Sequence, residues 1–189
     1  TAFRAEDGEP QWKTDKMSQQ VLTPAIHDGI VYALGRIEGT ASLAAFNLDD
    51  GAIRWTTALE NPSTSADPVV TDNGVLVVDG NTLNSYDHET GSKRSEIRLF
   101  NLDITVSTTV AADRGTAFVA NHEGLLAVDV EAETTRWLHE DNVYAQGFSV
   151  GSETVVAVVD GSEYISSESR ETITVFDRET GDVRWNYVL

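Results

Sequence analysis

Short apolar runs recur along the chain, and most are followed by a polar turn that contains Asp, Asn or Gly. Residues 30–35 and 154–159 are almost wholly apolar, as expected for strands that are buried on both faces. Turns such as Asp72-Asn73-Gly74 supply residues that adopt a positive φ angle in tight hairpins. No window keeps a 3.6-residue period over the length of a helix. The pattern therefore predicts an all-β fold.

The predicted strands fall into groups of four that are joined by these turns. The groups are 20–27, 30–35, 42–47 and 53–59; 66–71, 74–79, 82–87 and 93–99; 107–112, 116–120, 125–129 and 134–139; and 146–150, 154–159, 172–177 and 183–188. Residues 1–19 have room only for the outer half of a preceding group. Short antiparallel strands repeated in fours are typical of the blades of a β-propeller. We expect four blades and a spare outer strand pair.

A sequence tag ends each group: a strand, a polar turn closed by Gly, and a strand that opens with Arg-Trp. The tag residues are Gly8 and Trp12, Gly51 and Trp55, Gly91, Trp137, and Gly181 and Trp185. Ser95 stands where a Trp is expected, and Glu133 stands where a Gly is expected. The tags end at 12, 55, 95, 137 and 185, so they are 43, 40, 42 and 48 residues apart. This period is a propeller signature, and we expect the tryptophans to pack in the core between blades.

The tag, Ala-x-Asx-x-x-x-Gly-x-x-x-Trp, resembles the repeat of the pyrroloquinoline-quinone (PQQ)-like β-propellers. This superfamily includes the quinoprotein alcohol dehydrogenases and the barrel-assembly lipoprotein of bacterial outer membranes. The resemblance covers the whole chain and implies one repeat domain over residues 1–189. Its blade units would be 20–59, 66–99, 107–139 and 146–189, with residues 1–19 as the outer half of a preceding blade. Ser95 and Glu133 depart from the pattern and predict a weaker dock and a less regular turn in the second and third blades.

Familiar members of this superfamily have seven or eight blades, and this chain has about half that number. Three interpretations follow: a piece of a longer propeller, two copies that complete an eight-bladed ring, or an open arc. An open arc would expose an apolar blade face at each end. We expect a piece of a longer protein that associates with itself through open blade edges.

The chain is strongly acidic, with 13 basic and 31 acidic residues and a net charge of −18. This charge argues against nucleic acid and against an anionic membrane as partners. Lysine occurs only at 13, 16 and 93, a composition typical of salt-adapted proteins, which predicts a halophilic archaeon as the source. No apolar run is long enough to predict membrane insertion. Acidic surfaces suit a salty cytoplasm and a salty exterior, and we favour an extracytoplasmic or cell-surface location.

Two segments are longer than the other connections, 35–41 and 160–171, and long loops often carry function. The second forms a possible interaction loop or, equally, a solvated insertion; its candidate residues are Asp160, Glu163, Tyr164, Glu168 and Glu171. Its carboxylates could bind Ca²⁺, but their spacing matches no calcium loop, and we predict no metal site. The four histidines, His27, His88, His122 and His139, are scattered and are expected in exposed turns.

The resemblance to quinoprotein dehydrogenases implies PQQ and Ca²⁺ as cofactors, held beside a vicinal disulfide. The chain has no cysteine, which excludes that disulfide. The inner strands carry small polar residues without a titratable pair, so we predict no catalytic residue and no bound cofactor. The sequence favours a non-catalytic scaffold for protein–protein interaction or assembly. The alternatives are a fragment of a PQQ-dependent dehydrogenase and a sensor or cell-surface propeller domain.

Overall fold

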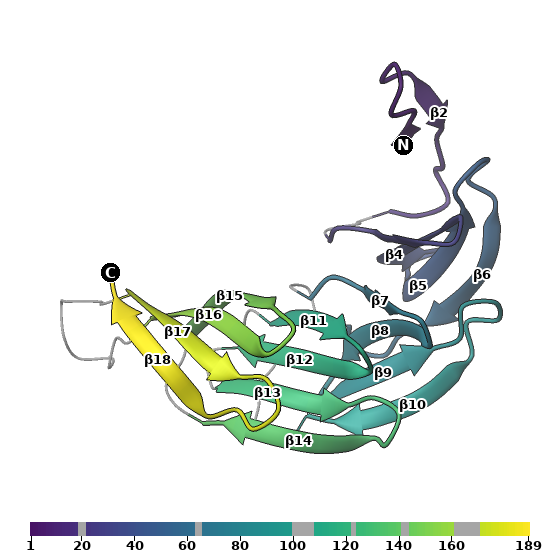
Figure 1. Ribbon diagram of the computed structural model, residues 1–189. Coiled ribbons are helices and arrows are strands. Elements are labelled where there is room, and N and C mark those ends of the chain that lie inside the picture. Colours follow the sequence, from purple (N-terminus) through teal and green to yellow (C-terminus); the bar gives the residue numbers. More distant parts are fainter. Residues whose placement is uncertain (19–21, 63–65, 100–107, 122–123, 141–143, 161–170) are drawn as a thin grey trace. The chain divides into compact units, whose positions relative to one another are not determined.

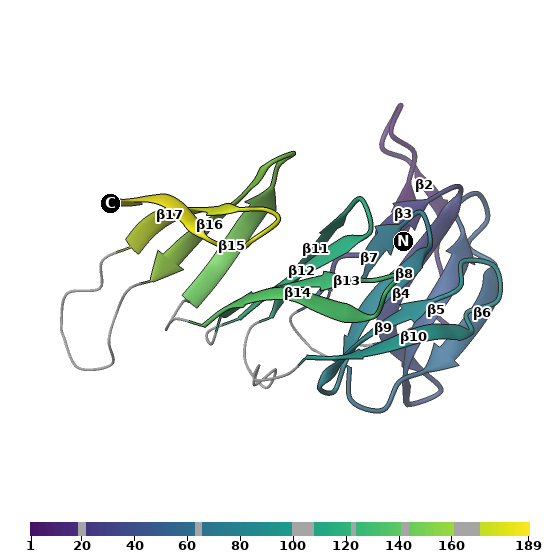
Figure 2. The ribbon, with the colours of Figure 1, turned by 60° about the horizontal axis from the view of Figure 1, so that its bottom comes forward.

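The computed structural model describes residues 1–18, 22–62, 66–99, 108–121, 124–140, 144–160 and 171–189, which form strands and turns and include no helix (Figure 1). A two-stranded sheet at the start, here called the N-terminal pair, contains β1 (Ala2–Phe3) and β2 (Pro10–Trp12). It is followed by sheets of four antiparallel strands, here called blades 1 to 4 (Figures 1 and 2). The all-β prediction is confirmed.

Every blade uses its strands in chain order, so that each pairs with the next along the chain. Blade 1 contains β3 (Ala25–His27), β4 (Ile30–Ile37), β5 (Thr40–Asn47) and β6 (Ile53–Ala58). Blade 2 contains β7 (Val69–Thr71), β8 (Gly74–Asp79), β9 (Thr82–Tyr86) and β10 (Lys93–Arg98). Blade 3 contains β11 (Thr109–Asp113), β12 (Thr116–Asn121), β13 (Gly124–Asp129) and β14 (Thr134–His139). Blade 4 contains β15 (Tyr144–Val150), β16 (Thr154–Asp160), β17 (Glu171–Asp177) and β18 (Val183–Val188).

The chain divides into two compact units. The first unit contains Thr1–Gly80 and Asn84–Arg94, and the second contains Asn81–Leu83 and Ser95–Leu189. Each unit has its own apolar cluster, around Trp55 in the first and around Trp137 in the second. The expectation that residues 1–189 form a single domain stays a prediction.

The segment 35–41 is a hairpin, so the prediction of a long loop there is wrong. β4 and β5 continue into it and leave only Glu38 and Gly39 as the turn, with φ angles of 50° and 86°. Positive φ at both central residues is the geometry that matches the twist of the flanking strands in a two-residue hairpin. The apolar pattern stops before the strands do, which is why the sequence suggested a loop.

A β-bulge interrupts the last strand pair of blades 1, 3 and 4 at the same place. In blade 4, Val175 lies opposite Trp185 and Phe176 lies opposite Val183, so Arg184 is the extra residue. Neighbouring residues Val175 and Phe176 point to opposite faces of the sheet, and so the bulge sends Trp185 and Val183 to opposite faces. The bulge therefore controls which face receives the tryptophan.

The extra arginine is held by the acidic or amide residue that begins the preceding turn, seven positions earlier. In blade 4, Arg184 Nη2 donates to Asp177 Oδ2 at 2.8 Å, and the other Asp177 oxygen accepts the backbone N–H groups of Glu179 and Thr180. We call this arrangement the arginine clip. The same clip joins Arg54 to Asn47, Arg94 to Asp87 and Arg136 to Asp129.

The clips lower the pKa of their carboxyl groups, because every partner favours the ionised form. For Asp177 the Arg184 guanidinium is the largest cause, followed by the turn N–H groups, and the pKa falls to about 2. Arg94 is the largest cause of the lowered pKa of Asp87. For Asp129 the backbone N–H of Ala132 comes first and Arg136 second.

We expect the clip in blade 4 to stabilise the fold in a pH-dependent way. The pKa of Asp177 is below its ordinary value of 3.8, so its contribution is complete above that value and is lost as pH falls through about 2. Replacing Asp177 by Asn, the residue found at position 47 in blade 1, removes this dependence. Carboxyl NMR titration and unfolding of both proteins between about pH 5 and pH 2 measure it. A carboxyl of Asp177 that titrates near 3.8 would contradict the clip.

Candidate functional site: the tryptophan docks and the open last strand

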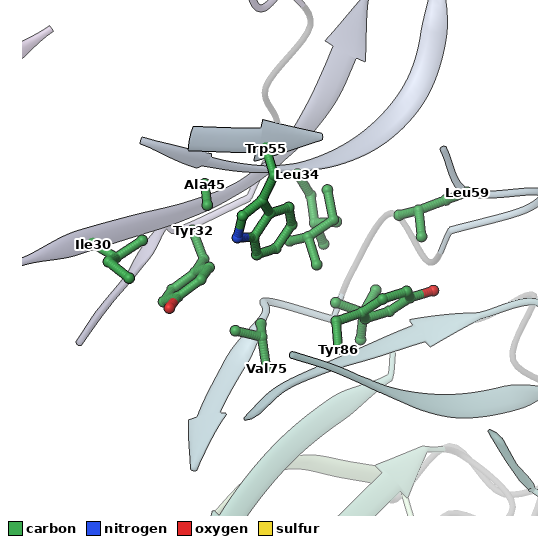
Figure 3. Packing of buried hydrophobic residues seen from close by; sticks show 10 residues of the cluster. Ile30, Tyr32, Leu34, Ala45, Trp55, Leu59, Val75 and Tyr86 are labelled. Atoms are coloured by element: carbon green, nitrogen blue, oxygen red, sulfur yellow. The ribbon is translucent and has the colours of Figure 1, made fainter. Parts of the chain in front are cut away.

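The tag tryptophan of one sheet packs on the tag glycine of the next sheet. A Cβ atom added to Gly181 of blade 4 would lie 2.6 Å from ring atoms of Trp137 in blade 3. A Cβ on Gly51 would lie 2.5 Å from the ring of Trp12. A Cβ on Gly91 would lie equally close to the ring of Trp55. Only a residue without a side chain leaves room for the indole, and we call each such contact a dock. Figure 3 shows the Trp55 side chain reaching from its own sheet toward Val75 and Tyr86 of blade 2.

Each dock is fixed by a hydrogen bond from the indole to the backbone. The Nε1–H groups of Trp12, Trp55 and Trp137 donate to the carbonyl oxygens of Leu48, His88 and Arg178, at 2.6, 2.8 and 2.8 Å. The acceptor lies three residues before the tag glycine in all three docks. The indole is thus held by its ring face and by its only donor.

A second polar contact comes from the residue that precedes the tryptophan. Gln11 donates to the Asp49 carbonyl oxygen at 3.0 Å, and Arg136 donates to Glu179 Oε2 at 3.3 Å. Asp49 and Glu179 each lie two residues before the tag glycine. Arg136 therefore serves two partners, its own clip residue Asp129 and the turn of the following blade.

Ser95 and Glu133, the two departures from the tag, stand at consecutive tag positions along the chain. Position 95 is the tryptophan position of blade 2, and position 133 is the glycine position of blade 3. Glu133 keeps the positive φ of the glycines, at 56°, although it carries a side chain. A serine at 95 offers no indole, and a glutamate at 133 does not leave the space that the dock glycines leave.

A polar cluster accompanies the dock of blade 1 with blade 2. His88 Nδ1 lies 2.7 Å from the Tyr32 hydroxyl, and His88 Nε2 lies 2.9 Å from the carbonyl oxygen of Thr71. A carbonyl only accepts, so Nε2 carries the proton and Nδ1 accepts from the tyrosine. The ring of His27 stacks on His88 with centroids 4.9 Å apart. Burial raises the pKa of Tyr32 to about 12, with the charge of Glu89 as the next cause.

In blades 3 and 4, the positions equivalent to those of this polar cluster carry different side chains. Asp113, Phe118 and Arg178 correspond to His27, Tyr32 and His88. The Arg178 side chain is only 4% exposed, and it donates to Asp113 Oδ2 at 2.7 Å and to the Asp113 carbonyl at 2.8 Å. It also donates to the Gly151 carbonyl at 2.9 Å and lies over the Phe118 ring, 5.3 Å from its centroid.

The histidines are not simply exposed turn residues, so that expectation is wrong for the ones described. His27 and His88 are half-buried in the cluster of the first unit. His139 is half-buried and meets the edge of Phe176 at a centroid distance of 4.8 Å. Aromatic neighbours brought together by the fold, which no spacing along the chain reveals, account for the difference. His122 lies outside the described residues.

Among the described residues, no dock is formed at Gly8 or at Trp185. Trp55 and Trp137 are buried and Trp12 is half-buried, as a core position requires. Trp185 is 55% exposed, contrary to the core expectation, and no described side chain covers it as the following blade covers Trp55 and Trp137. An added Cβ at Gly8 would meet nothing within 4 Å.

Exposed large apolar side chains gather on β18 and the residue after it: Val183, Trp185, Tyr187, Val188 and Leu189. Trp185 and Tyr187 lie opposite Val175 and Ile173, so they share one face of blade 4. In blade 1 the corresponding face, which carries Trp55, packs on blade 2. β18, at the edge of its sheet in Figure 1, therefore presents a formed but uncovered docking face.

The possible interaction loop lies mostly outside the described residues. Glu163, Tyr164 and Glu168 are among residues 161–170, which the structure does not describe. The backbones of Asp160 and Glu171 pair across β16 and β17. In the described part of the chain, no group of three His, Asp or Glu side chains is placed to hold a metal ion.

A cavity of about 360 Å³ lies between the N-terminal pair and blade 1. Its lining includes Phe3 and Trp12 from the pair and Ile26, Val31 and Phe46 from the blade. The pair has two strands where the blades have four, so it covers less of the blade face.

This architecture is similar to that of known proteins. A family model described as outer membrane protein assembly factor BamB matches residues 1–187. The crystal structure of BamB from Moraxella catarrhalis is similar, with a TM-score of 0.72 and 17% identity over 98% of this chain and 56% of that chain. The quinohemoprotein alcohol dehydrogenase from Comamonas testosteroni has a TM-score of 0.69 and 13% identity, over 93% of this chain and 36% of that chain. None of the curated proteins compared matches the chain.

The Pan2 WD40 domain of Neurospora crassa is also similar, with a TM-score of 0.61 and 10% identity over 94% of this chain and 58% of that chain. At these identities the solved structures show the fold alone. The chain is a partial β-propeller of four-stranded antiparallel blades, as the sequence predicted, and it spans about half the length of the BamB chain.

We expect substitution of a dock glycine to cost more than its backbone strain. Gly181 and Gly115 both have a φ of 75°, but only Gly181 has an indole against it. Gly115→Ala should destabilise the fold by about 1–2 kcal/mol through strain alone. Gly181→Ala should cost about 1–3 kcal/mol more, because the Cβ displaces Trp137. Urea unfolding measures both, and equal losses would show that the indole does not need the glycine.

We expect Tyr32 to ionise well above the ordinary tyrosine pKa of about 10. Its pKa is raised to about 12, so the stability that depends on the neutral hydroxyl is complete below about pH 10 and is lost as pH rises through about 12. Ultraviolet titration of tyrosinate should show a late phase that disappears in Tyr32→Phe. A late phase that persists in this variant would assign the raised pKa to another tyrosine.

Proposed function

We propose, since the chain belongs to the outer membrane protein assembly factor BamB family, that it is a non-catalytic β-propeller scaffold for protein–protein interaction or assembly. The family description names an assembly factor, and a scaffold of this kind presents surfaces rather than a reaction centre. Self-association through open blade edges is one form of such interaction.

The uncovered face of β18 is the observation that carries this proposal. Trp185 is 55% exposed and Tyr187 is 64% exposed, and both stand on the face that blade 1 buries. Contiguous exposed apolar side chains on a folded sheet mark a contact surface. Tryptophan and tyrosine are also the residues that contribute most to protein interfaces.

A location outside the cytoplasm, at the cell surface, is part of the proposal. It rests on the family description, which names the outer membrane. None of the described segments is a helix that could cross a bilayer. A sensor or cell-surface propeller domain would use the same face of β18, so it remains the neighbouring alternative.

A PQQ-dependent dehydrogenase is the catalytic alternative, favoured by the structural similarity to the quinohemoprotein enzyme. The residues present do not fit it well. The chain has no cysteine for a vicinal disulfide, and the described carboxylates form no cation-binding group. Most described acidic side chains with a lowered pKa are held by arginine or by turn N–H groups.

The test is a photo-crosslinking amino acid at Tyr187, with Val188 on the opposite face as the matched control position. We expect protein crosslinks, to another protein or to a second copy, from position 187 and few from position 188. In parallel, equilibrium dialysis with PQQ and Ca²⁺ should leave no quinone on the chain. Retained PQQ together with dye reduction by an alcohol would replace the scaffold by the dehydrogenase. Equal crosslinking at both positions would remove the β18 face as the contact surface.

A further inference from the structure

The chain carries both halves of a dock that it does not complete. The tryptophan half is Trp185 on β18, and the glycine half is Gly8 between β1 and β2. The completed docks show what each half lacks: the indole covers the glycine, and its N–H reaches the carbonyl three residues earlier.

The turn at Gly8 is built like the turns that receive an indole. Gly8 N–H donates to the Arg4 carbonyl at 2.9 Å, and Arg4 N–H donates to the Glu9 carbonyl at 2.9 Å. In blade 4 the equivalent bonds run from Gly181 to Asp177 and from Asp177 to Asp182, at 2.9 and 2.7 Å. Gly8 has a φ of 73°, beside 75° for Gly181. The Gly8 turn thus already has the conformation of a turn that receives an indole.

We propose that Trp185 of one copy of this chain docks on the Gly8 turn of a second copy. The indole covers Gly8, and its Nε1–H donates to the carbonyl oxygen of Ala5, which lies three residues before Gly8. The inference rests on the proposed function, because it names the partner of the same β18 face.

Charge favours this pairing locally. In two of the completed docks the residue before the tryptophan reaches the residue two before the glycine, as Arg136 reaches Glu179 and Gln11 reaches Asp49. In the open dock these positions are Arg184 and Glu6, again a cation and an anion. Arg184 holds Asp177 through Nη2, as Arg136 holds Asp129, so its clip is compatible with a second partner.

Overall charge opposes the pairing at low salt, since each copy carries −18. At about 1 M salt the screening length falls to about 3 Å, which removes the long-range repulsion and leaves the apolar contact. Association should therefore strengthen with salt, opposite to the behaviour of an interface held by ion pairs.

The proposed interface is heterologous, because each copy contributes a different half. The chain itself carries a residue without an indole at one tryptophan position, Ser95, and a residue with a long side chain at one glycine position, Glu133. Trp185→Ser and Gly8→Glu copy these two residues into the open halves. Each variant loses one half and keeps the other, so the two variants complement each other.

Light scattering after size exclusion in about 1 M salt is the test, over a range of protein concentrations. Wild type should associate, and Trp185→Ser alone and Gly8→Glu alone should each be monomeric. An equimolar mixture of the two variants should form a two-chain complex, since one intact half from each remains. Gly39→Glu, at an equally open positive-φ glycine, and Val188→Ser, on the opposite face of β18, should associate as wild type does.

Circular dichroism of each variant establishes that it is folded. A wild type that stays monomeric overturns the proposal, and so does a mixture that does not assemble. If Trp185→Ser loses association and Gly8→Glu keeps it, the indole binds elsewhere on the second copy, which also overturns it. Crosslinks from position 187 to another protein, without assembly of the mixture, would end the self-docking proposal and leave the scaffold function standing.

Discussion

The contact between an indole and a glycine is the constraint on which the rest of the repeat depends. The indole needs a turn without a side chain, and the turn needs positive φ, so glycine meets both demands at once. The tryptophan must also face the following sheet, and the bulge before it achieves that by inserting one residue. The inserted residue is arginine in blades 1, 3 and 4, and the clip anchors it to the turn. The tag spacing, the bulge and the clip therefore act together to place the tryptophan on the glycine of the next sheet.

The sequence predicted the strands well, because burial on both faces and glycine-closed turns leave a strong local signal. The bounds of β8, β14 and β18 agree with the predicted ranges 74–79, 134–139 and 183–188. The sequence also located the tryptophans and glycines, but not which one meets which, since a dock joins residues of neighbouring sheets. The arginine before Trp55, Trp137 and Trp185 was visible as part of the tag, yet its partner seven residues earlier went unrecognised. The clusters of His88 and Arg178 depend on three separate strands and turns, and no spacing along the chain could reveal them.

The two polar clusters differ in chemistry while sharing their positions, and this difference constrains which blades fit together. Arg178 finds a carboxylate and an aromatic face in blade 3, whereas His88 finds a hydroxyl and a second imidazole in blade 1. If blade 4 met blade 1, the buried guanidinium would face His27 in place of Asp113. A buried charge without its counterion is costly, so the clusters discriminate between neighbours that the docks alone would accept.

The arginine clip bears on how the composition of the chain is interpreted. A planar guanidinium can hold a turn carboxylate and reach a second acceptor, as Arg136 does, and a lysine ammonium does not match this fork geometry. Five of the ten arginines, Arg54, Arg94, Arg136, Arg178 and Arg184, are held in a clip or a buried cluster. The excess of arginine over lysine is thus partly an architectural requirement of the repeat. Relatives from fresh water that keep the clip should keep these arginines too, and only the remaining basic positions should vary with salinity.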